Sequence, residues 1–393
     1  MPNIMDYLEW RGDLTFSEAP LCEVDNLIFC LLSYVDLDGI VPRSIKDGCV
    51  TLREAAAEYF FTHPNMGERP LGFIIPADTL ILFRRMAHTR RFRDVFLTGY
   101  VNEISEERET QFAAFTVLLP NEEVFVAFRG TDDTIIGWKE DFNLSFMDEI
   151  PAQKRAAEYV NDLDVTPDTV LYIGGHSKGG NLAVWGAVHA KKEVQRMLRQ
   201  VYSNDGPGFS ANLVQSQAYK ALSDRIRVII PEDSLVGLLL DQDPRYTVVK
   251  SERRGLFQHD GLSWEVLGGQ FLRAQGLSGV GKRHDTVVRK RIASMTPSER
   301  QNLIHFMFTL LESTGAKTLT ELHRIRVRAA ITVLKTFREM PEEERETASY
   351  LWDKLMGNQC TESNPPPSAP RTKISPHKSR GKLKLSFFPL LLP

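Results

Sequence analysis

The sequence predicts an α/β protein in which helices flank a mostly parallel central sheet, with helical additions at both ends of the chain. Between residues 111 and 230, short runs rich in β-branched and aromatic residues alternate with segments of helical periodicity. The apolar run at residues 169–173 is typical of a strand buried on both faces, as parallel sheets require. With 393 residues, of which 42% are apolar, the chain can also bury a large core.

The N-terminal residues 1–75 are expected to form a helical lead-in that packs on a core at residues 76–290. Its clearest helix covers residues 23–34, where apolar side chains recur at helical spacing after an acidic start. A second helix is expected at residues 76–87, with Asp78 as the cap.

The core begins with a hairpin pattern, in which two β-rich runs are separated by Pro-Asn-Glu. Strands and helices then alternate, which favours a parallel sheet with helices on both faces. The expected elements are the hairpin strands 111–119 and 123–128, a helix at 152–160, a strand at 169–173, a helix at 181–189, a strand near 201–203, a further helix, and a strand at 225–230.

The C-terminal part divides into a helical region, residues 291–357, and a tail, residues 358–393. A helix start is expected at residues 296–300, because Pro297 suits the first turn and Glu299 lies nearby. The tail is rich in proline, then basic, then apolar, so we expect it to be flexible. It could contact an anionic membrane peripherally or remain solvated.

The composition excludes several classes of protein. A formal net charge of −3 argues against a protein that binds nucleic acid by neutralising phosphates. The first residues lack a secretory signal, and no apolar run reaches the roughly 20 residues that span a bilayer, so a cytoplasmic location is expected. The chain contains four cysteines, Cys22, Cys30, Cys49 and Cys360. They lack the paired spacing of zinc ligands, and they are too few for a disulfide-rich scaffold. No metal or other cofactor is therefore expected.

A candidate nucleophile lies in residues 175–179, Gly-His-Ser-Lys-Gly, which match Gly-x-Ser-x-Gly. This motif requires a strand, a tight turn and a helix, with Gly175 and Gly179 leaving room around Ser177. The strand at 169–173 and a helix starting near Lys178 provide that context. The alternative is a glycine-rich turn that only allows close packing or binds phosphate at the helix N-terminus.

A serine hydroxyl needs an imidazole to take its proton and a carboxylate to hold that imidazole. In folds with this motif the chain order is serine, acid, histidine. The preferred acid is Asp233, directly after the strand at 225–230, and the alternative acid is Asp205, which also follows a strand. Among the downstream histidines, His259 is the best placed, because it lies in a loop-like segment.

The negative oxygen of an acyl-transfer intermediate needs preorganised donors. The backbone N–H of Lys178, just after the serine, is one candidate. The second is expected from Thr131, in the turn Arg129-Gly130-Thr131 that follows the strand at 123–128. Without that role, the same residues form an ordinary turn between a strand and a helix.

Four motifs together resemble the class 3, fungal-type triacylglycerol lipases, and they span roughly residues 110–265. They are residues 126–131 with 137–141, residues 175–180, residues 232–236, and residues 259–264. The resemblance implies an α/β-hydrolase fold, a triad of Ser177, Asp233 and His259, and an oxyanion role for Thr131. The whole arrangement, including residues 6–14, is also similar to an uncharacterised bacterial branch of lipase-like proteins.

The resemblance implies a serine hydrolase that cleaves a carboxylic, lipid-like ester through an acyl-enzyme. Lys178 replaces the apolar residue usual after the serine and places a charge near the site, and the secretion signal of the fungal enzymes is absent. These departures favour an intracellular esterase over extracellular triglyceride digestion. The alternatives are a catalytically silent binding module and an acyltransferase that uses the same residues; the oligomeric state is left open.

Overall fold

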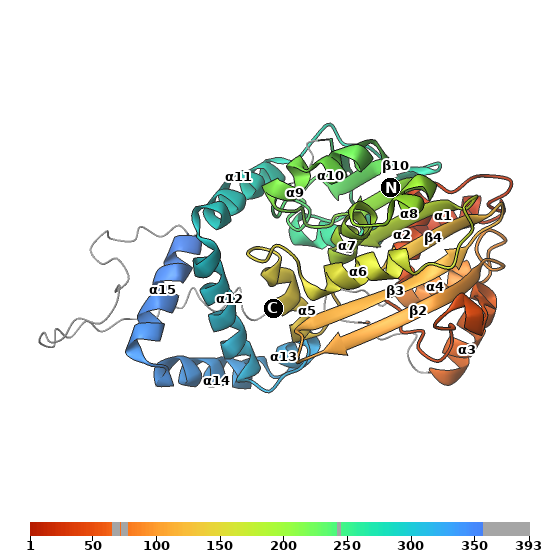
Figure 1. Ribbon diagram of the computed structural model, residues 1–393. Helices are drawn as coiled ribbons and strands as arrows, with labels where there is room; N and C mark the ends of the chain where they lie inside the picture. Colours follow the sequence, from red (N-terminus) through yellow and green to blue (C-terminus); the bar gives the residue numbers. More distant parts are fainter. Residues whose placement is uncertain (65–70, 72–77, 242–244, 357–393) are drawn as a thin grey trace, which may run out of the picture. The chain divides into compact units, whose positions relative to one another are not determined.

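The computed structural model describes residues 1–64, 71, 78–241 and 245–356 (Figure 1). It divides into two compact units, Met1–Thr286 and Val287–Pro393. The proposed tail at residues 358–393 lies outside the described residues, so its flexibility and its membrane contact stay predictions from sequence. In the part of the chain that the structure describes, no helix is both long and apolar enough to cross a membrane.

The first unit is built on an eight-stranded sheet in which the strands follow their chain order from β1 to β8. The strands are β1 (Val50–Thr51), β2 (Phe96–Ser105), β3 (Thr110–Leu118), β4 (Glu123–Phe128), β5 (Val170–His176), β6 (Leu198–Asn204), β7 (Ile226–Pro231) and β8 (Thr247–Val249). Neighbours from β1 to β4 are antiparallel, and those from β4 to β8 are parallel. The predicted α/β class, with a central sheet flanked by helices, is confirmed.

Helices surround this sheet, and a small hairpin of β9 (Val266–Leu267) and β10 (Gln270–Phe271) lies beyond it. The helices are α1 (Ile4–Arg11), α2 (Glu23–Leu32), α3 (Leu52–Thr62), α4 (Asp78–Met86), α5 (Ile135–Asn143), α6 (Pro151–Asn161), α7 (Lys178–Val188), α8 (Lys192–Met197), α9 (Ala211–Gln215) and α10 (Gln217–Leu222). Short 3₁₀ turns are η1 (Ile45–Asp47), η2 (Ser223–Arg225), η3 (Gly255–His259) and η4 (Gly261–Ser263).

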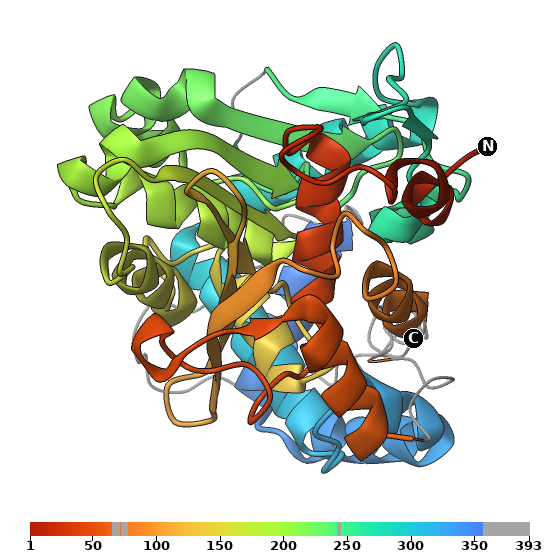
Figure 2. The same ribbon diagram turned by 90° about the vertical axis from the view of Figure 1, so that its right-hand side faces the viewer.

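The two faces of the sheet support separate apolar cores, because successive side chains of a strand point to opposite faces. From β4, Phe125 and Ala127 join the core that contains α2 and α4, whereas Val126 and Phe128 join the core that contains α6 and α7. Figure 2 shows α2, in red, running beside the strands, and it packs on β5. The N-terminal lead-in therefore forms one of the two covering layers of the sheet.

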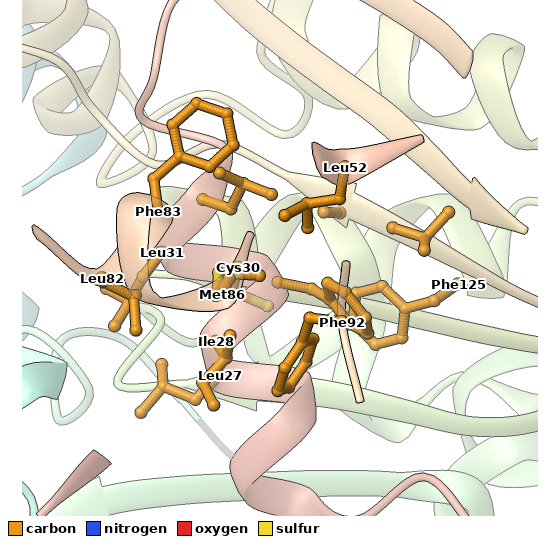
Figure 3. Close-up of a cluster of buried hydrophobic side chains, with 14 of the residues drawn as sticks. Leu27, Ile28, Cys30, Leu31, Leu52, Leu82, Phe83, Met86, Phe92 and Phe125 are labelled. Atoms are coloured by element: carbon orange, nitrogen blue, oxygen red, sulfur yellow. The ribbon is translucent and has the colours of Figure 1, made fainter. Parts of the chain in front are cut away.

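The α2 face of the sheet is filled by interlocking aliphatic and aromatic side chains. Figure 3 shows Leu27, Ile28, Cys30 and Leu31 among side chains that include Leu82, Phe83, Met86, Phe92 and Phe125. Phe29 is fully buried, and its ring centroid lies 5.5 Å from that of Phe92 and 5.3 Å from that of Phe125. Such aromatic contacts add to the stabilisation from apolar burial.

Most predicted elements of the core are present with shifted ends. The hairpin of β3 and β4 is confirmed as antiparallel, and the predicted helix at 76–87 is α4, whose first two predicted residues lie outside the described ones. β2 was not predicted, since Gly99 and polar residues interrupt its alternation. Its register with β3 shifts between Thr98 and Val101.

The second unit consists of helices, and α11 (Gly279–Ser294) crosses the boundary between the units. Its helices are α12 (Pro297–Glu312), α13 (Leu319–Arg324), α14 (Arg326–Glu339) and α15 (Glu342–Met356). The predicted start of α12 is confirmed, because Thr296 and Glu299 form a reciprocal capping box with bonds of 3.2 and 2.7 Å.

Replacing Phe29 by alanine tests the contribution of α2 to the core. We expect Phe29→Ala to lower the free energy of unfolding by about 3–5 kcal/mol, because a large buried ring leaves a cavity. Phe61→Ala is the matched control, since Phe61 is 82% exposed and its loss should change the free energy by less than about 0.5 kcal/mol. Urea unfolding of both variants measures the difference, and equal losses would contradict this account of the core.

Candidate active site

Ser177 occupies a strained turn between β5 and α7. Its φ of 58° and ψ of −134° are values that residues with a side chain rarely adopt, and such strain collects at functional sites. Its N–H donates to the Asn204 carbonyl at 3.0 Å, and its carbonyl accepts from the Gly180 N–H at 2.9 Å. These bonds hold a turn of the kind that the motif predicted.

Two glycines of the motif are required by close backbone packing. A Cβ on Gly175 would lie 2.0 Å from the carbonyl carbon and oxygen of Gly179, and a Cβ on Gly179 would lie 2.2 Å from the Phe128 carbonyl oxygen. Neither backbone neighbour can move away as a flexible side chain could. The turn therefore needs glycine at both positions to bring the start of α7 against the end of β4.

His259 is paired with a buried carboxylate. Its Nδ1 lies 2.7 Å from Asp205 Oδ2, and both side chains are buried. Asp205 follows β6 with a φ of 49°, and its N–H donates to the Ile229 carbonyl at 2.8 Å. Because the carboxylate accepts from Nδ1–H, the Nε2 lone pair of His259 is left to accept a proton.

The second oxygen of the Asp205 carboxylate, Oδ1, accepts two hydrogen bonds. Oδ1 accepts from Ser234 Oγ at 2.5 Å and from the Gly237 N–H at 3.1 Å. These two hydrogen bonds fix the orientation of the carboxylate. The His259 ring is thus held by an acid that is itself held by two donors.

The prediction that Asp233, rather than Asp205, faces His259 is corrected by this geometry. Asp233 Oδ2 accepts from the Gly255 N–H at 2.8 Å, and its Oδ1 accepts from Ser278 Oγ. It therefore anchors the segment that leads to His259. The physical reason is strand order: β6, which ends before Asp205, pairs directly with the nucleophile strand β5, whereas β7, which ends before Asp233, lies one strand further away.

His176 connects the nucleophile turn to His259. Its Nε2 lies 2.7 Å from the His259 carbonyl oxygen, and the two ring centroids are 4.6 Å apart. A carbonyl only accepts, so Nε2 carries the proton and Nδ1 accepts from the Tyr34 hydroxyl at 3.0 Å. Burial, followed by the neighbouring His259, lowers the pKa of His176 to about 3, so this imidazole is neutral.

Among the described residues, no hydrogen bond joins Ser177 Oγ to His259. Serine–histidine bonds are often long before substrate binds and tighten in the reacting complex. The contact between the two histidine rings nevertheless brings the His259 segment against the residue that precedes the serine. The predicted serine and histidine are therefore brought together at the ends of β5 and η3.

The predicted oxyanion turn lies against the nucleophile. A Cβ on Gly130 would lie 3.0 Å from Ser177 Cβ and 2.5 Å from the His176 carbonyl oxygen. Thr131 Oγ1 donates to Asp141 Oδ2. Arg129 is buried, and its guanidinium donates to Asn102 Oδ1 at 2.9 Å and to Asp132 Oδ2 at 3.3 Å. These bonds hold the turn against β2 and against the residues that follow it.

The Lys178 side chain is fully buried below the turn. Its Nζ donates to Glu140 Oε2 at 2.8 Å and lies 3.8 Å from Asp141 Oδ1. The charge expected near the site is thus present, but a carboxylate neutralises it. The Lys178 backbone N–H remains at the first residue of α7, as the motif predicted.

A family model matches residues 86–309, which is more than half of the chain, and its description is Mbeg1-like. The chain belongs to the Mbeg1-like family. The match includes the candidate nucleophile, both acids, His259 and the oxyanion turn, but it begins after Tyr34. In this Mbeg1-like chain the matched residues include strands β2 to β8 of the sheet, the serine turn and the histidine loop.

A search of solved structures finds the crystal structure of M37 lipase at 16% sequence identity and a TM-score of 0.34. The similarity covers 54% of this chain and 68% of that one. A search of curated proteins gives no match. Within the described residues of this Mbeg1-like protein, no group of three histidine, cysteine or acidic side chains could hold a metal ion.

Sequence reasoning missed three residues that contact the site of this Mbeg1-like chain: Tyr34, His176 and Glu140. His176 lies inside the motif, so its position beside the serine was a usable signal. Tyr34 and Glu140 reach the site only through tertiary packing, from the segment after α2 and from α5. Local patterns contain no sign of either contact.

Gly179→Ala tests the packing of the nucleophile turn. We expect a loss of about 1–3 kcal/mol in the free energy of unfolding, because the new methyl group meets the Phe128 carbonyl. Gly269→Ala is the control, since a Cβ there has no neighbour closer than 3.6 Å and should change the free energy by less than about 0.5 kcal/mol. A Gly179→Ala protein as stable as the control in urea would show that the turn is not so tightly packed.

Proposed function

We propose that the protein is a serine hydrolase that cleaves a carboxylic ester through an acyl-enzyme intermediate. Ser177 is the nucleophile, His259 the general base and acid, and Asp205 the carboxylate that orients His259. The observation that carries this proposal is the 2.7 Å bond from His259 to Asp205 at the sheet edge where the strained Ser177 turn lies. A buried acid, a paired imidazole and a serine on a tight turn are the parts that acyl transfer requires.

In the first half of the reaction, Ser177 Oγ attacks the ester carbonyl while its proton moves to His259 Nε2. Asp205 keeps the opposite nitrogen, Nδ1, in the donating form and stabilises the imidazolium that forms. The carbonyl oxygen becomes negative, and the N–H groups of Lys178 and Thr131 donate to it. His259 then gives its proton to the departing alcohol, leaving Ser177 acylated.

The second half repeats these roles with water as the nucleophile. His259 Nε2 takes a proton from water, which attacks the acyl group, and Ser177 leaves with the proton that His259 returns. His176 assists without exchanging protons, because its low pKa keeps it neutral beside the transient imidazolium. A positive charge on His176 would oppose that imidazolium.

A lipid-like ester is the substrate class that we favour. The resemblance of the motifs to class 3 lipases supports it, and so do two apolar side chains next to the site. Leu256 and Phe257, on the same short turn as His259, are 53% and 72% exposed. Exposed apolar groups of that size suit an acyl chain or a similar apolar group.

Reaction with a fluorophosphonate probe tests the nucleophile. We expect the folded wild-type protein to be labelled and Ser177→Ala to lose the label, because the probe phosphonylates an activated serine hydroxyl. Ser210→Ala, which changes the exposed cap of α9, should be labelled like the wild type. Intact-mass spectrometry reads out the adduct, and a Ser177→Ala protein that still labels at the wild-type rate would refute the assignment.

A pair of carboxylate variants separates the two acids. Asp205→Asn should reduce kcat for p-nitrophenyl esters on the order of 10³- to 10⁴-fold, because an amide favours the wrong imidazole tautomer. Asp233→Asn should cost less than about tenfold, since Asp233 binds Gly255 and Ser278 and makes no bond to His259 in the described structure. A larger loss of kcat in Asp233→Asn than in Asp205→Asn would instead identify Asp233 as the acid.

A further inference from the structure

A buried ionic cluster below the oxyanion turn is not used by the reaction steps above. It consists of Lys178 from α7 with Glu140 and Asp141 from α5. The cluster contains one ammonium group and two carboxyl groups, so the three charges cannot cancel when both acids are ionised. The hydrogen bonds show which acid is matched to the ammonium and which is not.

Lys178 and Glu140 form a saturated pair. The Lys178 ammonium donates to Glu140 Oε2 at 2.8 Å, to the Gln111 carbonyl at 2.8 Å and to Gln111 Oε1 at 2.9 Å. Glu140 also accepts from the Gln111 N–H, from Thr110 Oγ1 and from the Ala152 N–H at 2.8–3.0 Å. An ammonium has three protons, and all three are engaged here.

Asp141 is the unmatched acid. Its Oδ2 accepts from Thr131 Oγ1, whereas its Oδ1 is buried and accepts no hydrogen bond within the described part of the chain. The Lys178 ammonium, 3.8 Å from Oδ1, is the cation that faces it. Burial raises the pKa of Asp141 to about 6, and Lys178 acts in the opposite direction.

Other charged or titratable groups act on Asp141 from neighbouring segments. Glu140 on the same helix and Asp132 after β4 both disfavour its ionised form. Tyr34, which follows α2, also interacts electrostatically with Asp141, and burial raises the pKa of this phenol far above its usual value. Lys178, followed by the hydrogen bond from Thr131, thus favours the ionised form of Asp141 against burial and the two neighbouring carboxylates.

We propose that the Lys178 ammonium is a positioning group for the oxyanion hole, because it keeps Asp141 ionised and thereby fixes the hydroxyl and the backbone N–H of Thr131. The proposal rests on the proposed function and adds a role for a side chain that faces away from the substrate. An ionised carboxylate only accepts, so the Thr131 hydroxyl must donate to it in one orientation. A protonated Asp141 can donate as well, and the Thr131 turn then has two arrangements.

Two variants shift the charge on Asp141 in opposite directions. Lys178→Met/Glu140→Gln removes both partners of the saturated pair, so neither partner is left buried without the other, and Asp141 loses its ammonium neighbour. Losing the ammonium outweighs losing Glu140, so Asp141 should titrate at a higher pH than in the wild type. Glu140→Gln alone leaves one ammonium for one carboxylate, so Asp141 should titrate at a lower pH than in the wild type.

Carbon-13 NMR of aspartate-labelled protein measures this titration directly, with the Asp141 signal assigned by its loss in Asp141→Asn. Arg91→Met/Asp25→Asn is the matched control, because it removes another fully buried ion pair, 2.6 Å long, in the same unit. The control should leave the Asp141 titration unchanged. If the double variant does not fold, the downward shift in Glu140→Gln still tests the link, and an unchanged Asp141 titration overturns it.

The pH dependence of kcat tests whether the link reaches the reaction. In Lys178→Met/Glu140→Gln the fall of kcat at acidic pH should begin at a higher pH than in the wild type. At alkaline pH, kcat should return to the wild-type value. In an Asp141→Asn background the same double change should no longer shift the pH at which kcat falls. A shift that persists in that background would show that Lys178 acts directly on His259, which overturns the proposal.

These measurements distinguish failure of this proposal from failure of the proposed function. A wild-type protein that hydrolyses no ester, yet shows the shifted Asp141 titration, refutes the hydrolase assignment and leaves the link between Lys178 and Asp141 standing. An active protein whose Asp141 titration does not respond to Lys178 refutes the positioning role alone.

Discussion

The parallel register of β5 and β6 determines where the groups of the candidate site meet. It pairs His176 with Asn204, so the next residue of each strand, Ser177 and Asp205, emerges at the same level of the sheet edge. Both residues have positive φ values, and both donate their N–H to a carbonyl of the neighbouring strand. A slip of one residue would reverse which side chains face each core and would separate the serine from the acid.

The helical N-terminal layer supports that edge from one side. Asn26 Nδ2 donates to Asn204 Oδ1 at 3.0 Å, and Asn204 Nδ2 donates to the Gly175 carbonyl at 3.0 Å. Farther along the same segment, the Tyr34 hydroxyl binds His176, which in turn donates to the His259 carbonyl. The segment before the family match thus contributes contacts on which the positions of the serine turn and the histidine depend. We regard it as part of the same domain as the candidate site.

Local sequence was sufficient for the parts of the site that depend on local geometry. The Ser177 turn follows from a glycine-flanked serine between an apolar strand and a helix, and the Arg129–Thr131 turn follows from its position after β4. The acid could not be chosen in this way, because Asp205 and Asp233 both follow strands. The order of the strands in the sheet, which is a tertiary property, separates them.

The elements missed in the fold have similar explanations. β2 is interrupted by Gly99 and by a register shift, and β1 and β8 contain two and three residues, so none shows a clear alternating pattern. Lys178 could be recognised as a departure from an apolar position, but its partner Glu140 could not, because α5 and α7 meet only in the folded chain. The charge that sequence reasoning placed near the substrate is matched by a carboxylate below the turn.

A crystal structure of the fluorophosphonate adduct tests the central claim most directly. The account predicts phosphorus bonded to Ser177 Oγ, a phosphoryl oxygen that accepts from the N–H groups of Lys178 and Thr131, and His259 Nδ1 still bonded to Asp205. An adduct in which His259 turns to Asp233, or in which the phosphoryl oxygen points away from both N–H groups, would contradict it.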